Sequence, residues 1–527
     1  MFKKVSLIII CIVLILGVVA CDEEVTNNEP SFTDIINDVT STPDQKNVTT
    51  PTKGGTVSLS VAVYNTLNPL ITNNEDIKNY MNLVFDSMVK VNFEQTVVPE
   101  LCESWQMGET AAKWYFTIRA GVKWHDGTDF TNNDIKATID WVMKNGGLYL
   151  VNVSGISSCN ILEDGRIELL LKAPDMLLPN KLLFPILKEN LLTSGSFNAI
   201  GTGLYKIESD AADKIVLVEN TNYWSVDKPY ISKVEINKYT TESDKYKSTS
   251  DIIMLSAENV YKYSVKPEYK SIKFPSRSFG FLAINNRSEQ LQSANVRKAI
   301  AFCLDKENII NMALSGHGIA TDWPIFPGSV YWREGSTDQT RNLAKARELL
   351  LADGYTQSEG TWSKNGKILS INCIMAPSDN EIALALQTVQ TQLGECGIPL
   401  TIESLTADKL RNSTTSGQYD MAILRINISS WPNLETTVMT NQTMNIFGFS
   451  NAEIDQFFNS FNEEPVLTKQ SEILKKIKLR LNESVPFIGL YLRKDALVIS
   501  NKIEGPEITG ISSWDPFESF AKWYVVQ

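Results

Sequence analysis

The adjacent residues His125 and Asp126 are the pair in this sequence whose types best suit general acid–base chemistry. A histidine titrates near neutral pH, and a neighbouring carboxylate can orient its ring. However, Gly127 follows, and aspartate and glycine are also residues that form tight turns. The only other histidine, His317, is far away in sequence, so neither a histidine-based triad nor a zinc site is indicated. We therefore assign no catalytic residue here and interpret 125–127 as a structural turn.

A second motif, Gly201-Thr202-Gly203, resembles half of a phosphate-binding loop. It lacks the lysine and the following serine or threonine with which a P-loop holds phosphate and magnesium. We interpret it as a backbone bend that leads into a strand. The 61 Asp and Glu residues leave open a secreted hydrolase that uses two carboxylates, although no motif supports one. The sequence indicates no cofactor and no metal site.

The N-terminal segment before Cys21 is organised like a secretory signal. Two lysines precede an apolar run over 5–19, which is shorter than the roughly 20 residues of a membrane-spanning helix. The run ends Val18-Val19-Ala20-Cys21, which resembles a bacterial lipobox. We expect a signal peptide over 1–20 and lipidation of Cys21, with an ordinary signal peptide as the alternative. The polar composition of 21–53 predicts a disordered tether between a lipid anchor on the outer face of the cell membrane and a folded body.

The composition beyond the signal peptide indicates a large acidic body. Cleavage of the signal peptide removes two lysines and takes the formal net charge from −12 to −14. This negative charge argues against nucleic-acid binding. The 507 residues that remain of 527 exceed the size of a single core, so at least two lobes are expected. The number of cysteines beyond Cys21 is odd, so they cannot all be paired in disulfides. We interpret them as scattered structural thiols, with a Cys373–Cys396 disulfide as an alternative. They are Cys102, Cys159, Cys303, Cys373 and Cys396.

Strand and helix patterns alternate along the body, which predicts an α/β fold. Alternating apolar residues predict strands over 56–63, 114–119, 167–171 and 214–218. Helical periodicity predicts helices over 294–304, 306–314, 343–352, 451–462 and 467–483, and another that begins after Thr131 as its N-cap. The order strand 369–375, helix 381–393, strand 400–402 forms a crossover unit and predicts a parallel strand pair.

Several segments, taken in order, resemble the bacterial extracellular solute-binding proteins of family 5, the peptide- and nickel-binding lipoproteins of ABC importers. The resemblance covers about 55–503. Where the family more often has alanine, this chain has Cys102. The segments are Leu67-Asn68-Pro69-Leu70, Leu83-Val84-Phe85-Asp86-Ser87-Met88-Val89, Val98-Pro99-Glu100-Leu101-Cys102-Glu103-Ser104-Trp105, Phe116-Thr117-Ile118-Arg119, Gly121-Val122-Lys123-Trp124-His125-Asp126-Gly127-Thr128, Gly201-Thr202-Gly203-Leu204-Tyr205, Asn222-Tyr223-Trp224, Val296-Arg297-Lys298-Ala299-Ile300 and Leu304-Asp305-Lys306.

The resemblance implies a two-lobed α/β fold like that of type II periplasmic binding proteins. Within that class it points to the large peptide-binding cluster, whose members have an extra inserted subdomain. It places lobe 1 in 54–284, with the inserted subdomain at about 83–195, lobe 2 in 285–490, and a return to lobe 1 over 491–527. It further implies a monomer that binds a small solute between hinged lobes and passes it to the permease subunits of an ABC importer.

By the same resemblance, the loop after a strand over 419–424 lines the ligand cleft. Its candidate ligand residues are Arg425, Asn427, Ser429 and Trp431. Peptide-binding relatives commonly carry an aspartate here for the peptide's amine, but this chain has no acid before Glu435. The resemblance also makes Tyr64, Asn65 and Tyr491 candidates.

The role of Arg425 has two interpretations. Its two-pronged guanidinium suits a ligand carboxylate. Alternatively, it forms a salt bridge between the lobes.

The sequence leaves the ligand open. A peptide is the leading hypothesis, and a modified amino acid, a sugar or a metal chelate is the alternative within the same fold. A carboxylate-dependent hydrolase and a scaffold without a ligand are hypotheses of other classes.

Overall fold

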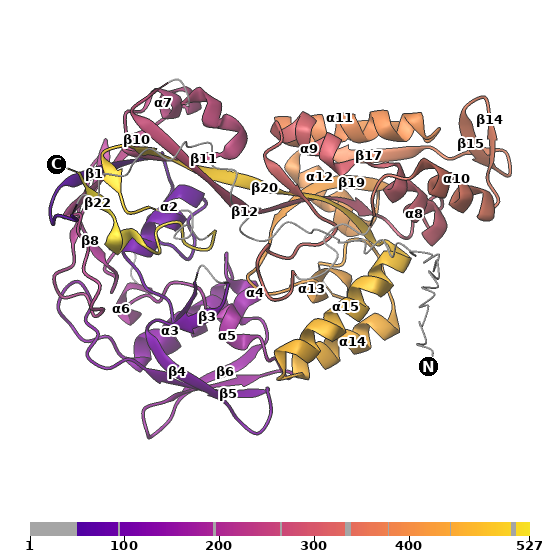
Figure 1. The fold of residues 1–527 in the computed structure, drawn as a ribbon. Coiled ribbons are helices and arrows are strands. Elements are labelled where there is room, and N and C mark those ends of the chain that lie inside the picture. Colours follow the sequence, from indigo (N-terminus) through magenta and orange to yellow (C-terminus); the bar gives the residue numbers. More distant parts are fainter. Residues whose placement is uncertain are drawn as a thin grey trace, which may run out of the picture.

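The computed structural model describes residues 50–526, except 93–94, 193–196, 264–265, 333–338, 378, 443 and 507–512. The signal peptide, Cys21 and all but the last four residues of the expected tether therefore lie outside the described residues. The described chain is a mixed α/β protein of two lobes, which are connected by a long pair of strands (Figure 1). No helix among these residues is both long and apolar enough to cross a membrane.

An eleven-stranded sheet extends through both lobes in the order β18-β17-β19-β12-β20-β11-β1-β10-β9-β8, with β13 paired to β20 outside this order. Its strands are β1 (Thr56–Ala62), β8 (Tyr205–Asp210), β9 (Lys214–Glu219), β10 (Lys233–Tyr239), β11 (Ile252–Ser256), β12 (Tyr269–Ile284), β13 (Gly318–Ala320), β17 (Ile371–Met375), β18 (Leu400–Ser404), β19 (Met421–Asn427) and β20 (Phe487–Ser500). We refer to the β11-to-β8 side as lobe 1 and to the β18-to-β19 side as lobe 2.

The antiparallel strands β12 and β20 belong to both lobes. In lobe 1 their pairing runs from Tyr269 opposite Ser500 to Pro275 opposite Lys494, and in lobe 2 it resumes with Phe279 opposite Leu492. The register shifts between Pro275 and Phe279. A proline cannot donate to the ladder, and such irregularities bend a strand. The break therefore marks the point where the lobes meet.

Lobe 1 and its neighbouring subdomain share one buried core. The strands β1, β10 and β11 are parallel, and helix α2 (Glu75–Tyr80) begins where the Asn74 side chain accepts a hydrogen bond from the Ile77 amide. The subdomain has a four-stranded sheet in the order β4-β5-β7-β6. Its helix α3 (Asn132–Asn145) begins with a capping box formed by Thr131 and Asp134, so the predicted cap is confirmed. Its strands are β4 (Cys102–Met107), β5 (Lys113–Ile118), β6 (Ile156–Ile161) and β7 (Ile167–Leu171), and β2 (Val89–Val91) pairs with β3 (Val97–Pro99).

The turn interpretation of His125–Gly127 is confirmed by its contacts. The Gly127 amide donates to the Trp124 carbonyl at 2.8 Å. The His125 ring accepts from the Gly201 amide through Nδ1 at 3.1 Å, so its Nε2 is left to donate to the Gly203 carbonyl at 3.1 Å. Burial lowers the pKa of His125 to about 4, which keeps the ring neutral in this role. The histidine thus fixes the backbone bend at 201–203.

In lobe 2 the predicted crossover is confirmed, because β17, α11 (Asn380–Glu395) and β18 follow one another and the strands are parallel. Asp379 caps α11 by accepting a hydrogen bond from the Ile382 amide. The helices pack around two further buried clusters, one of which is rich in aromatic residues. They include α8 (Ala294–Cys303), α9 (Lys306–Leu314), α10 (Leu343–Ala352), α12 (Ala407–Ser416), α13 (Glu435–Val438), α14 (Ala452–Glu463) and α15 (Leu467–Ser484).

Candidate ligand cleft between the lobes

Two adjoining cavities lie where the lobes meet. The hinge-side cavity, of about 550 Å³, lies against the middle of β12 and β20, and the loop-side cavity, of about 310 Å³, lies against the loop after β19. Glu75, Asn79, Arg277 and Asn427 line both, so the two cavities are contiguous. Their sizes are those of sites for small molecules.

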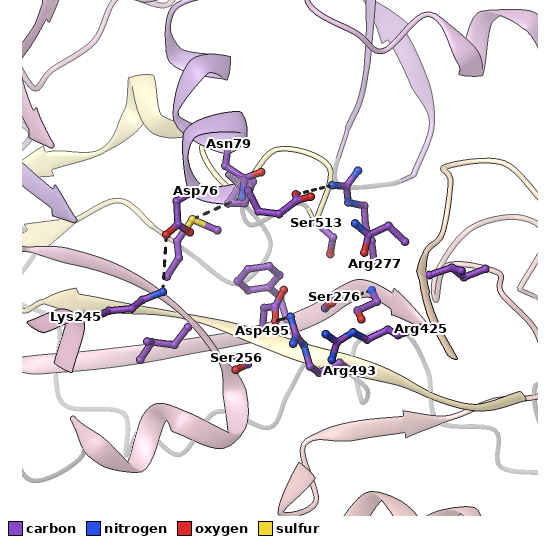
Figure 2. Close-up of a pocket in the computed structure, with 18 residues that line it drawn as sticks. Asp76, Asn79, Lys245, Ser256, Ser276, Arg277, Arg425, Arg493, Asp495 and Ser513 are labelled. Carbon is purple, nitrogen blue, oxygen red and sulfur yellow. Dashed lines mark hydrogen bonds and ion pairs between the residues drawn. The ribbon is translucent and has the colours of Figure 1, made fainter. Parts of the chain in front are cut away.

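The hinge-side cavity is lined by more cationic than anionic side chains. Figure 2 shows the charged side chains converging from α2, α7 (Glu242–Lys247), β12, β19 and β20. Arg277 and Glu75 are paired at 3.7 Å, Lys245 and Asp76 at 3.8 Å, and Arg493 and Asp495 at 3.1 Å. The cationic residues are Lys245, Arg277, Arg425 and Arg493, and the acids are Glu75, Asp76 and Asp495.

Arg425 is held within lobe 2. Its guanidinium contacts Asp379 at 3.1 Å and Glu381 at 2.7 Å, and both carboxylates belong to the start of α11. Arg493 approaches the same Glu381 at 3.6 Å. Burial raises the pKa of Glu381, and the two arginines oppose that shift. The salt bridges of Arg425 therefore do not cross between the lobes, and two carboxylates already balance its charge.

Arg277 is less tightly compensated. Its guanidinium lies 5.6 Å from the centre of the Trp514 ring, and its carboxylate partner Glu75 is 60% exposed. It lies in the register break of β12, where the strand leaves one lobe and enters the other. Arg277 therefore presents a weakly neutralised cation to both cavities.

In the loop-side cavity the acidic side chains outnumber the cationic ones. Its acids are Glu75, Glu100, Asp515 and Glu518, and its cationic residues are Lys78, Lys90 and Arg277. Burial raises the pKa of Glu518 to about 7, and burial together with Asp86 raises the pKa of Glu100 to about 8. The acids come from lobe 1 and from the C-terminal stretch. They provide the carboxyl groups that the loop after Arg425 lacks, and Glu518 and Glu100 become negatively charged as the pH rises through about 7 and about 8.

Four of the seven predicted ligand residues lie at these cavities. Arg425 and Asn427 line the hinge-side cavity, and Asn427, Ser429 and Trp431 line the loop-side cavity. Trp431 is only 5% exposed, and the Lys181 ammonium lies 5.7 Å from the centre of its ring.

The other three predicted residues line neither cavity. The Tyr64 hydroxyl donates to Asp210 at 2.8 Å, and the Asn65 side chain accepts from the Asn73 amide at 3.2 Å. Tyr491 is fully buried and donates to Glu381 at 3.0 Å. Its ring packs over Gly280, where an added Cβ would lie 2.7 Å from the ring. Tyr491 thus positions the carboxylate that holds Arg425.

Sequence reasoning missed the charged residues of α2, β12 and β20. One signal was available: Arg493 and Asp495 follow Tyr491 at intervals of two, which places all three on one face of a strand. Nothing comparable marks the acids of α2, which reach the cleft through the packing of lobe 1.

The lobes also touch at the outer end of the loop-side cavity, in what we call the rim contact, formed by 175–181 against Ser430, Glu435 and Asn462. The Met176 amide donates to the Asn462 carbonyl at 2.8 Å, and Ser430 donates to the Asn180 carbonyl at 3.3 Å. The Lys181 ammonium lies 2.6 Å from Asp175 and 3.6 Å from Glu435. Leu177, which is 4% exposed, is buried in the aromatic-rich core of lobe 2.

Comparison with known proteins identifies the family. The model of the bacterial extracellular solute-binding proteins, family 5 (Middle), matches residues 96–446. The chain is 25% identical over 370 residues to the nickel-binding periplasmic protein of Escherichia coli K12, covering 65% of this chain and 70% of that protein. It is 21% identical over 546 residues to the oligopeptide-binding protein AppA of Bacillus subtilis 168, covering 95% of this chain and 96% of that protein.

The fold agrees with that of solved structures. The structure of the oligopeptide-binding protein AppA from Bacillus subtilis in complex with a nonapeptide superposes with a TM-score of 0.71 at 20% identity, covering 91% of this chain and 100% of that one. The expected two-lobed binding-protein fold is thus confirmed. The chain belongs to the bacterial extracellular solute-binding proteins of family 5.

Proposed function

We propose that this protein captures a small zwitterionic solute, a peptide or peptide-like molecule with free amino and carboxyl groups, and delivers it to an ABC importer. The observation that carries this proposal is the different balance of acidic and cationic side chains in the two adjoining cavities. Four cationic side chains face three acids in the hinge-side cavity, and four acids face three cationic side chains in the loop-side cavity. A solute whose carboxylate meets Arg277 and whose amine lies toward Glu518 matches both.

The anchoring and the mode of capture form part of the same proposal. The lipobox-like end of the signal peptide supports lipidation of Cys21, which would hold a monomer on the extracytoplasmic face beside the importer's permease. The register break in β12 supports a hinge there, about which the lobes close on the solute.

The solute itself provides the test. Protein purified from membranes without refolding is denatured, and the released material is identified by mass spectrometry. Calorimetric titration then compares the released solute with its N-acetylated and C-amidated derivatives. Each modification is expected to weaken binding, because each leaves buried charges of the cleft without their partner. Wild-type affinity for both derivatives would contradict the proposal.

A metal chelate that carries carboxylates is the second candidate. The cationic lining of the hinge-side cavity favours it, because Arg277, whose partner Glu75 is largely exposed, could pair with a carboxylate of a chelator. Elemental analysis of the released material separates the candidates, since only a chelate contains stoichiometric metal.

Binding of the amino group is expected to strengthen as the pH rises from 6 to 8. Glu518 has a pKa of about 7, raised mainly by burial, so it is largely neutral at pH 6 and becomes charged across this range. An α-amino group begins to lose its own charge near pH 8, which sets the upper limit. Titration calorimetry at pH 6, 7 and 8 should show a smaller pH effect in Glu518→Gln. An unchanged effect in that variant would exclude Glu518 as the cause.

Stability provides an independent check of the Glu518 pKa. A carboxyl group whose pKa is raised from 4.5 to about 7 in the folded state destabilises that state progressively as the pH rises between those values. The Glu518→Gln variant should therefore gain stability over the wild type at pH 8 but not at pH 4.

A further inference from the structure

The five cysteines of the described residues are all free thiols in this structure, but two of them lie together. Cys303 is the last residue of α8 and is buried, whereas Cys396 follows α11 as its C-cap and is partly exposed. Their thiols are close enough to affect each other, because Cys396 raises the pKa of Cys303 and Cys303 lowers the pKa of Cys396. Cys373, which the sequence allowed as a disulfide partner of Cys396, is instead buried within β17.

Contacts on both sides hold these two helix ends against each other. The Gln392 side chain, one turn before Cys396, accepts from the Asp305 amide at 2.9 Å and donates to the Asp305 carbonyl at 3.2 Å. On the other side, the Arg341 guanidinium lies 2.5 Å from Glu395, next to Cys396. The neighbouring Asn342 amide donates to the carbonyl of Phe302, next to Cys303, at 2.7 Å. The residues that flank each cysteine are thus tied together.

We propose that Cys303 and Cys396 form a disulfide bond in the mature protein, which cross-links α8 to α11 within lobe 2. The family is extracytoplasmic, and disulfides form and persist in oxidising compartments of that kind. Neither cysteine lines the two cavities, so the bond is independent of the proposed solute.

The reaction is thiol–disulfide exchange with an external disulfide, either small or carried by a protein oxidant. The neighbouring Cys303 side chain, and then the Arg341 guanidinium, lower the pKa of Cys396, which makes this more accessible thiol the first nucleophile. Its thiolate attacks one sulfur of the external disulfide and releases one thiolate. Cys303 then loses its proton to solvent, attacks Cys396 and releases the second thiolate. The chain loses two electrons and two protons, and the oxidant becomes two thiols.

Peptide mapping tests this proposal directly. The full mature protein is purified from membranes with an alkylating agent present from lysis, and is then denatured and digested without reduction. We expect the peptides that contain Cys303 and Cys396 to appear joined, lighter by two hydrogens than the separate peptides. We expect Cys102, Cys159 and Cys373 to be alkylated. Alkylation of both Cys303 and Cys396, or a link from either to Cys373, would overturn the proposal.

Thermal unfolding tests the consequence with a matched control. The bond would close the chain between 303 and 396, which restricts the unfolded state. A reducing agent should therefore lower the Tm of the wild type by a few degrees and leave that of Cys396→Ser unchanged. Cys373→Ser removes another buried thiol of lobe 2 and should keep the reduction-dependent fall. An equal response to reduction in Cys396→Ser and the wild type would contradict the cross-link.

Discussion

Replacing Arg277 with alanine is expected to weaken binding of the natural solute roughly 30- to 700-fold, equivalent to about 2–4 kcal/mol, with little loss of stability. Arg277 lines both cavities, and its only carboxylate contact recorded among the described residues is with the largely exposed Glu75. A solute carboxylate would therefore be its main partner in the closed cleft. Its removal would leave that carboxylate desolvated and unpaired.

Arg425 provides the informative contrast. Arg425→Ala should reduce both affinity and Tm, because Glu381 is only 10% exposed and would keep just one cationic partner among the described residues, Arg493 at 3.6 Å. Trp431→Ala should likewise weaken binding. Arg480→Ala serves as the control, since it removes a partly exposed arginine that is paired with Glu453 and lines neither cavity. Calorimetric titration and thermal unfolding on the same samples separate these outcomes. Wild-type affinity in Arg277→Ala would show that the carboxylate is bound elsewhere.

Replacing Cys21 with alanine is expected to move essentially all of the protein from the membrane fraction to the soluble fraction. Acyl chains contribute about 0.8 kcal/mol per buried methylene, so their loss removes the whole anchor. The folded body should be unaffected, because 34 residues separate Cys21 from Thr56, the first residue of β1. Membrane fractionation followed by alkaline extraction measures the effect.

Cys11→Ala is the matched control for this experiment. Cys11 lies inside the apolar run, before the expected cleavage site, so its replacement should leave anchoring unchanged. Retention of Cys21→Ala on membranes after alkaline extraction would be incompatible with a lipid anchor at Cys21.

Local sequence patterns were sufficient to predict much of the fold. The cap at Thr131 and the crossover of β17, α11 and β18 depend on residues close together in the chain, and both are confirmed. The cleft is different, because its charge depends on the long-range pairing of β12 with β20. A shift of one position in that register would turn Arg493 and Arg277 to other faces.

Family resemblance placed ligand candidates in the loop after β19, and residues of that loop do line the cavities. It also placed Tyr64 and Asn65, after β1, in the cleft, but neither residue lines a cavity. Tyr64 is bonded to Asp210 of β8 and faces Lys238 of β10, and these contacts with the far strands of lobe 1 turn it away from the cleft. Such contacts between distant strands leave no periodic signal in the sequence. The position of Tyr64 therefore required the structure.

The rim contact has a consequence for the kinetics of capture. In the proposed hinge motion, opening withdraws Leu177 from the core of lobe 2, at a cost of about 1.5–3 kcal/mol, and separates Lys181 from Glu435. None of these interactions involves the solute, so they slow dissociation of any molecule that the closed cleft encloses. They equally slow entry, because a closed cleft must open first. The rim contact thus favours long residence over rapid exchange, as suits a carrier that must hold its solute until it meets the importer.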